Sequence, residues 1–297
     1  MTEPKYIVLL GLSLFLFGGC DAPPSSDPLT RGYAEDVCPS CMVWNVRHAP
    51  FQIFGNTYYV GTEGLATVLI TSATGHVLID GGLPDSAPLI EENVSALGFD
   101  IADVELILNS HAHFDHSGGI AALQRSSGAT VMASGPSAAE IRHGNAGADD
   151  PQYGLLFDYP PVMSVEEFAF GEAIVLGDLS ITPHSTPAHT LGGTTWSWRA
   201  CEAGECLNHV YADSQTPVSA DGYRFSDRLD LARFERGYAT LEDLPCDILI
   251  TPHPSASSFW ERRAGPEGLV DPGACGRYAA SAREQLARRL ATERGQE

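Results

Sequence analysis

The sequence predicts an α/β protein in which two β-sheets pack between helices. Segments rich in β-branched and aromatic residues are followed by segments of helical periodicity, and this order occurs twice along the chain. The 297 residues include 43% hydrophobic residues, 30 glycines and 20 prolines. This composition is typical of a globular chain with a sizeable core and many turns, and it argues against disorder, a coiled coil or collagen.

The N-terminus predicts export. Residues 6–19, YIVLLGLSLFLFGG, are apolar and follow a short head that contains Lys5. Their length fits a signal peptide and falls short of the roughly 20 residues of a transmembrane helix. The run from Leu16 to Cys20 resembles the lipoprotein box of bacterial lipoproteins. We therefore expect a signal peptide over 1–19, a lipidated Cys20 and a periplasmic protein that meets the membrane only through this anchor. The alternative is an ordinary secreted protein whose Cys20 is free or removed.

The elements after residue 50 follow from local patterns. Turn pairs such as Gly55-Asn56 and Thr74-Gly75 separate runs of β-formers, and Leu89, Ile90 and Val94 recur at helical spacing. Strands are expected within 52–61, 65–72, 76–82, 104–110, 130–134, 172–178, 179–186, 194–200, 209–214 and 247–252. Helices are expected over 86–97, 118–125, 136–143, 227–241 and 276–293. Residues 144–164 carry Gly, Asp and Pro and predict a surface loop.

The cysteine count predicts disulfides, and the net charge limits the classes of molecule that the protein can bind. Six cysteines besides Cys20 predict disulfides in an exported protein, and local spacing favours the pairs Cys38–Cys41, Cys201–Cys206 and Cys246–Cys275. A zinc site made from the first two of these pairs is the alternative. The formal net charge of −21 repels phosphate backbones, so nucleic acid is not an expected partner. Metal cations and neutral or zwitterionic small molecules are compatible with this charge.

One short motif concentrates metal-binding chemistry. The segment from His111 to His116, HAHFDH, directly follows the expected strand 104–110. In an extended segment His111 and His113 point the same way, and a turn can present Asp115 and His116 to a neighbouring site. Imidazole and carboxylate ligands suit Zn²⁺. Further along the chain, His189 and His253 stand in turn-rich loops after strands, where additional ligands are expected.

These motifs resemble those of a known family. HAHFDH followed by Ser117-Gly118-Gly119, together with LIDGG, TPAHT, YADS and TPHP in order, resembles the five motifs of the metallo-β-lactamase superfamily. The stretches PFQIFGNTYYVG and YADSQTPVSADGYRF are similar to class B β-lactamases of the third subclass. The resemblance implies an αββα sandwich that forms a catalytic domain over 48–297, after a lipidated tether and extension over 20–47. We expect this domain to act as a monomer.

The resemblance also implies two Zn²⁺ ions and a reaction. It assigns the first zinc to His111, His113 and His189, and the second to Asp115, His116 and His253. A zinc-bound hydroxide, oriented by the catalytic Asp115, would hydrolyse the β-lactam amide bond of penicillins, cephalosporins and carbapenems and so confer antibiotic resistance. The cysteine ligand of the other di-zinc branch has no counterpart, because its place falls at Ser214.

Four more residues receive expectations from the same resemblance. Asp80 in LIDGG is expected to hydrogen-bond behind the metal ligands rather than to bind metal. Ser214 and Thr216 lie where the subclass binds the carboxylate of the antibiotic, although simple hydrogen bonding within the loop is the alternative. Gln215 stands where the subclass has leucine, which leaves substrate preference open.

Two other functions remain open on this scaffold. A lactonase or a thioesterase of the glyoxalase II type uses a bridging aspartate, and Asp213 in YADS could fill that role. A lipid-anchored zinc-binding or scaffold protein is the non-catalytic alternative. Metal content separates the scaffold from the enzymes, and a panel of β-lactams, lactones and thioesters separates the enzymes from one another.

Overall fold

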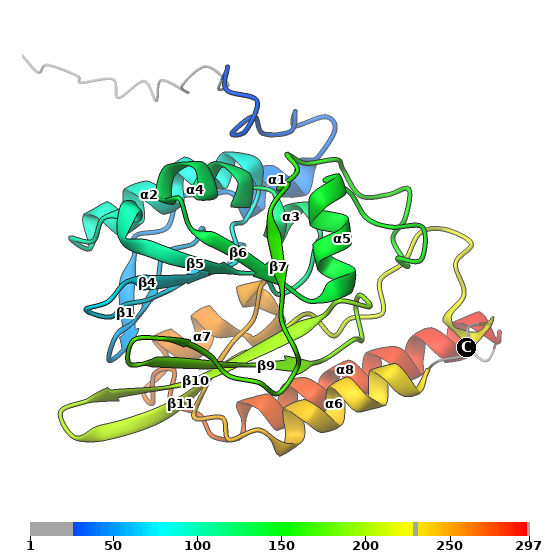
Figure 1. The fold of residues 1–297 in the computed structure, drawn as a ribbon. Helices are drawn as coiled ribbons and strands as arrows, with labels where there is room; N and C mark the ends of the chain where they lie inside the picture. The colour runs from blue at the N-terminus through cyan, green and yellow to red at the C-terminus, as the bar shows by residue number, and fades with distance from the viewer. Residues whose placement is uncertain (1–25, 228–230, 296–297) are drawn as a thin grey trace, which may run out of the picture.

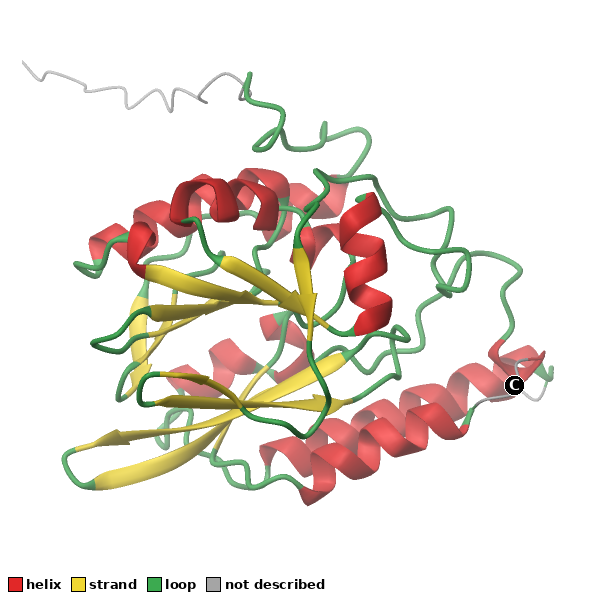
Figure 2. Cartoon of the chain, viewed as in Figure 1, coloured by secondary structure: helices red, strands yellow, loops and turns green. Residues whose placement is uncertain are grey.

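A computed structural model of the protein describes residues 26–227 and 231–295. The described strands form two sheets that lie face to face, and helices cover the outer face of each sheet (Figures 1 and 2). The predicted α/β sandwich of two sheets between helices is therefore confirmed. None of the helices in these ranges has both the length and the hydropathy that crossing a bilayer requires. The predicted signal peptide and Cys20 lie outside the described residues.

Each sheet has its own strand order. The first sheet contains, in chain order, β1 (Phe51–Phe54), β2 (Thr57–Tyr59), β3 (Val68–Ile70), β4 (His76–Ile79), β5 (Val104–Leu108), β6 (Thr130–Ala133) and β7 (Val165–Glu167). Its neighbours pair antiparallel from β1 to β4 and parallel from β4 to β7. The second sheet contains β8 (Ile174–Leu176), β9 (Leu179–Ser185), β10 (Thr194–Glu202), β11 (Glu205–Tyr211) and β12 (Ile248–Ile250). Only its β11 and β12 pair in parallel, and the other neighbours are antiparallel.

The helices complete the two outer layers. The first sheet is accompanied by α1 (Pro39–Trp44), α2 (Ala87–Ala96), α3 (Phe114–Ser117), α4 (Ile120–Ser127) and α5 (Gly135–His143). Figure 1 shows α2 and α4 above this sheet, and α6 (Ala232–Asp243) and α8 (Ala274–Glu293) side by side below the second sheet. The short helix α7 (Phe259–Ala264) follows β12.

Alternation along the strands sorts the side chains into separate cores. On β4, Val77 and Ile79 belong to the core between the sheets, whereas Leu78 packs with α2 and α4 on the outer side. On β11, Tyr211 faces the core between the sheets and Val210 faces the core under α6 and α8. This period of two is what a strand buried on both faces requires.

Most of the predicted elements are confirmed to within a few residues, and four short ones were missed, namely β7, α1, α7 and α3, where only a turn was expected. β7 was missed because it has three residues, of which only Val165 is buried. Helices α1 and α7 have six residues each, too few for a periodic pattern. The three predicted disulfides are present, including Cys38–Cys41, which joins the N-cap residue of α1 to its first turn. They leave no thiols for the alternative zinc site in those cysteines.

The fold brings the functional loops to one edge. Asp80 follows β4, His111 follows β5, His189 follows β9 and His253 follows β12. The two sheets are joined at this edge, where the backbone N–H of Thr194 donates to the carbonyl of Ser110 over 2.8 Å. Ligands of α/β proteins commonly bind at the carboxyl ends of strands, and the predicted ligand residues lie there.

Candidate metal centre

A buried aspartate holds the start of the histidine loop in place. Asp80, at φ +62°, accepts hydrogen bonds from the backbone and hydroxyl of Ser110, at 2.7 and 2.6 Å, and from the Tyr211 hydroxyl at 2.9 Å. Burial raises the pKa of this carboxyl, although nearby His116 and these hydrogen bonds oppose the effect. Asp80 therefore links β4, β5 and β11 directly behind the loop.

Close backbone contact then fixes the turn that follows the loop. Gly81 donates from its backbone to the carbonyl of His116 over 2.8 Å. A Cβ atom at Gly119 would lie only 2.2 Å from the Gly81 carbonyl oxygen, so this crossing requires glycine. The helix α3 begins at Phe114, so Asp115 and His116 lie in its first turn, whereas His113 has an extended backbone. The helix therefore directs Asp115 and His116 differently from His111 and His113.

Three histidines form the first group of possible metal ligands. One ligand atom from each of His111, His113 and His189 lies within 4.8 Å of the others, and all three side chains are buried. Their ring centroids lie 4.7, 5.1 and 4.9 Å apart in the pairs His111–His113, His111–His189 and His113–His189.

Asp115, His116 and His253 form the second group, also within 4.8 Å. The Asp115 carboxylate lies 3.3 Å from Nε2 of His116 and 3.1 Å from Nε2 of His253. The rings of His116 and His111 lie 4.4 Å apart between centroids, so the two groups adjoin each other. The six residues that the resemblance assigned to two metals are thus gathered as two triplets.

Each histidine of the first group has one ring nitrogen held by a partner that lies behind it. Nδ1 of His111 lies 2.7 Å from Asp213, Nε2 of His113 lies 2.9 Å from Asp150, and Nδ1 of His189 lies 2.9 Å from the Thr216 carbonyl. Such partners fix the tautomer and aim the other nitrogen. Nε2 of His111 is buried and has no hydrogen-bond partner. An unpartnered buried imidazole nitrogen is costly, and a metal ion would satisfy it.

The electrostatics of the triplets also favour a cation. Burial, together with the neighbouring histidines His116, His113 and His189, holds the pKa of His111 well below its ordinary value, so its ring is neutral and can donate a lone pair. Burial and then nearby His113 lower the pKa of His189 to about 3. Burial alone would raise the pKa of Asp115, but His116 and His253 hold it well below its ordinary value. Neutral imidazoles and an ionised carboxylate are the forms that bind zinc.

A cleft of about 370 Å³ lies over both triplets. Trp44, Phe114 and Leu156 give it apolar walls, and Gln152, Ser214 and Thr216 give it polar groups. This combination of apolar walls and a few convergent polar groups is typical of a small-molecule site.

Ser214, Thr216 and Gln215 lie next to the metal-ligand triplets but differ in their access to the cleft. Ser214 lines the cleft and is 7% exposed. The Thr216 hydroxyl lies 3.3 Å from Nδ1 of His189, so Thr216 contacts that histidine through both its carbonyl and its side chain. Gln215 is buried and donates to the carbonyls of Asp213 and Ser214, which turns it away from the cleft.

Asp213 lies behind His111 and belongs to neither triplet. Burial and the charge of Asp80 raise the pKa of Asp213 well above its ordinary value. Asp213, which could bridge two metals in the alternative enzymes, therefore contacts His111 from behind and does not join either triplet.

Two residues of the 144–164 loop that were not predicted as site residues contact the first triplet. Asp150 contacts His113, and Gln152 Nε2 lies 3.2 Å from Nε2 of His189. Burial would raise the pKa of Asp150, but the hydrogen bond with His113 holds it below its ordinary value. Only the consecutive acids Asp149 and Asp150 hinted at a function in a stretch that otherwise predicts a loop.

The chain is similar to known proteins over this whole region. Residues 60–199 match the family model described as the metallo-β-lactamase superfamily. The Rm3 metallo-β-lactamase is 50% identical at a TM-score of 0.84, with 86% of this chain and 99% of that chain covered. MEM-A1, a subclass B3 metallo-β-lactamase from a soil metagenome library, is 46% identical at a TM-score of 0.83, with 86% and 100% covered.

A more distant relative has another activity. The hydroxyacylglutathione hydrolase of Anaeromyxobacter dehalogenans is 30% identical over 132 residues, which span 44% of this chain and only 41% of that relative's own length. The identity and coverage of the structural relatives decide the family: the chain belongs to the metallo-β-lactamase superfamily, and the resemblance to its third subclass is confirmed.

Proposed function

We propose that this member of the metallo-β-lactamase superfamily is a hydrolase that opens the β-lactam ring of penicillins, cephalosporins and carbapenems with the help of two zinc ions. The observation that carries the proposal is the pair of three-residue ligand groups in one cleft, in a chain 50% identical to a metallo-β-lactamase over 99% of that protein. The reaction breaks the cyclic amide C–N bond by addition of water.

The donor sets suit zinc. His111, His113 and His189 would hold the first ion, and Asp115, His116 and His253 the second. Bound zinc would lower the pKa of a water molecule and polarise the lactam carbonyl. Asp115 has its carboxylate directed at His116 and His253. From that position Asp115 would orient the attacking water, and Asp80 would keep the ligand loop in register through Ser110.

Ser214 and Thr216 would receive the substrate's carboxylate at the polar side of the cleft. Ser214 is the better placed of the two, because the Thr216 hydroxyl already lies 3.3 Å from His189. Trp44 and Phe114 would exclude water from the apolar part of the substrate. Gln215 would influence substrate preference only indirectly, since its side chain is hydrogen-bonded inside the loop.

A thioesterase remains the competing function because of the hydroxyacylglutathione hydrolase relative. That chemistry in the superfamily requires a bridging aspartate, for which Asp213 is the candidate. Its Oδ1 faces His111 at 2.7 Å, an arrangement that supports a positioning role over a bridging one.

The decisive experiment measures zinc content and turnover together. We expect the zinc-loaded protein to hydrolyse a penicillin and a carbapenem, to lose activity reversibly with a chelator, and to resist inhibitors that acylate an active-site serine. His116→Ala should fold, retain about one zinc per chain and lose activity by about 10- to 100-fold or more, because the second ligand group is broken. His143→Ala, which removes an exposed histidine, is the matched control. A zinc-loaded parent that cleaves only lactones or hydroxyacylglutathione would contradict the proposal.

Cellular location completes the proposal. The disulfides and the bacterial export signal favour the periplasm, with Cys20 carrying a lipid anchor. Disulfides form in that oxidising compartment, which would preserve the bridges Cys38–Cys41, Cys201–Cys206 and Cys246–Cys275.

A further inference from the structure

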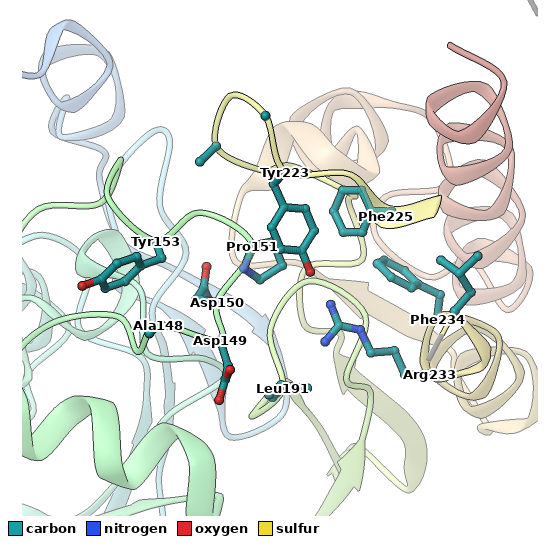
Figure 3. A pocket seen from close by; sticks show the side chains of 13 residues that line it. Ala148, Asp149, Asp150, Pro151, Tyr153, Leu191, Tyr223, Phe225, Arg233 and Phe234 are labelled. Atoms are coloured by element: carbon teal, nitrogen blue, oxygen red, sulfur yellow. The ribbon is translucent and has the colours of Figure 1, made fainter. Parts of the chain in front are cut away.

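A second cavity lies behind the loop that carries Asp150. It measures about 490 Å³ and is bounded by the loop at 148–153, the segment at 220–225 and the start of α6 (Figure 3). Tyr153 and Leu191 on its rim are 57% and 47% exposed, so the cavity is accessible from solvent. A volume of this size accommodates a small organic molecule.

Arg233 is the notable group in this cavity. Its side chain is only 8% exposed, and Figure 3 shows its guanidinium directed from α6 toward the loop that carries Asp149 and Asp150. Within the described ranges, no hydrogen bond or ion pair involves this guanidinium. Its Cζ atom lies 5.2 Å from the centre of the Phe234 ring. A guanidinium this enclosed, with no acceptor among the described residues, has N–H groups that an anion would satisfy through charge-assisted hydrogen bonds.

The surrounding backbone also favours an anion at this end of α6. Leu231 is the N-cap residue of α6 and provides no side-chain hydrogen bond to the first turn. Uncapped amide groups and the positive end of the helix dipole stabilise negative charge. They act in the same place as the Arg233 guanidinium, because Leu231, Arg233 and Phe234 all line the cavity.

The other side chains that line the cavity indicate which kind of anion it would bind. Tyr153, Tyr223, Phe225 and Phe234 present aromatic rings to the cavity. Aromatic walls pack well against a planar ring. A guanidinium pairs with a carboxylate through two parallel hydrogen bonds. The carboxylates of Asp149 and Asp150 in the same lining, and the formal charge of −21, disfavour a doubly charged phosphate.

This cavity is distinct from the metal cleft. The backbone N–H of Ala220 donates to the Pro151 carbonyl over 2.8 Å and joins the two loops that separate the spaces. Val218 and Gln152 line the metal cleft, whereas Ala220 and Pro151 line the second cavity. Neither Arg233 nor its aromatic neighbours contact the ligand triplets.

We propose that this cavity is a second ligand site, that it binds a small aromatic monocarboxylate, and that Arg233 is its anion-binding group. The site is independent of the function proposed for the metal centre. Its ligand would lie behind the loop from which Asp150 and Gln152 reach His113 and His189.

The test is a titration of the zinc-loaded, isotopically labelled protein with phenylacetate, followed by NMR. The side-chain Nε–H of Arg233 reports on the cavity, and the indole N–H of Trp44 reports on the metal cleft. We expect the Arg233 signal to shift and to saturate in the millimolar range, which is ordinary for a ligand of this size. Neutral phenylacetamide should bind about 10-fold more weakly or worse, because it lacks the charge-assisted pair.

Two variants separate a specific site from general charge attraction. Arg233→Met keeps the length of the side chain and should weaken phenylacetate binding about 10-fold or more, as read from the Tyr223 amide. Arg236→Met removes the same charge from the exposed face of α6 and should bind as the parent does. If Arg233→Met does not fold, Arg233→Lys, which loses the planar fork, should still show weaker binding.

Three results would overturn the proposal. The first is a response of Trp44 without any response of Arg233. The second is no saturation of the Arg233 signal at about 20 mM phenylacetate, well above the expected range. The third is equal binding by Arg233→Met and the parent. A β-lactamase activity assay plays no part in these readouts, so failure of this site and failure of the proposed function are distinguishable.

Discussion

Asp150→Asn would measure how much a carboxylate behind a histidine contributes to metal binding. Asp150 Oδ2 lies 2.9 Å from Nε2 of His113, both side chains are 2% exposed, and Asp150 Oδ1 accepts from the backbone of Gln152 over 2.7 Å. Asparagine retains the shape and can still accept a hydrogen bond, but it removes the negative charge. The change therefore isolates the electrostatic support of His113 from its orientation.

The expected loss follows from the burial of the pair. Partners behind metal-bound histidines typically contribute about 10- to 100-fold in metal affinity, or about 1.4 to 2.7 kcal/mol. Solvent screens a pair this deeply buried very little, so we expect a loss in the upper half of that range. The parent and the variant should reach equal activity when zinc is in excess, because the ligands themselves are intact.

Competition with a chromophoric chelator measures the zinc affinity directly, and zinc per chain after dialysis gives a second readout. Asp149→Asn is the matched control, because Asp149 is the preceding residue, carries the same charge and has an exposed side chain. If Asp150→Asn bound zinc within about 2-fold of the parent, or if Asp149→Asn lost as much affinity, the argument from the buried pair would be refuted.

Three further predictions concern stability and location. Replacing both Cys246 and Cys275 by alanine should lower the free energy of unfolding in urea by about 3.5 kcal/mol, because the bridge closes a loop with a sequence separation of 29; a change under about 1 kcal/mol would argue against this chain-entropy account. Burial would raise the pKa of Glu293, but hydrogen bonds from the Ser226 backbone and Arg289 lower it from 4.5 to about 2. Glu293 therefore contributes stability that is fully present above pH 4.5 and is lost as the pH falls toward 2. Glu293→Gln should therefore destabilise the protein at neutral pH and lose this effect near pH 2, and equal destabilisation at both values would contradict the assignment. Cys20→Ala should release the exported protein to the soluble fraction or leave its precursor uncleaved, whereas unchanged processing and membrane partitioning would disprove lipidation.

The sequence revealed the parts of the site that are local along the chain. His111, His113, Asp115 and His116 lie within one short segment after a buried strand, so their proximity needed no knowledge of the fold. The layered α/β architecture could also be predicted, because the periodicities of strands and helices can be recognised from residues that are close together in the sequence. His189 and His253 could be connected with that segment only through the family resemblance.

The groups that support the ligands could not be foreseen in the same way. Asp150 is 37 residues from His113 and lies in a stretch without periodicity, so only the tertiary path of the loop brings the two together. The cavity at Arg233 has the same origin, since its walls come from segments near residues 150, 190 and 225. A sequence pattern reports on neighbours along the chain, whereas these contacts depend on how distant loops pack.

The buried acids around the histidines favour a bound cation. Asp80, Asp115, Asp150 and Asp213 are all buried, and burial by itself raises the pKa of every one of them. Without positive charge, part of this group must take up protons or depend on histidines whose own pKa values burial lowers, as it does for His111. A divalent cation bound to the free ring nitrogens would stabilise the ionised acids and the neutral imidazoles together. The carboxylates in and behind the two triplets would therefore favour a divalent cation, and removing any one of them should weaken metal binding more than it disturbs the fold.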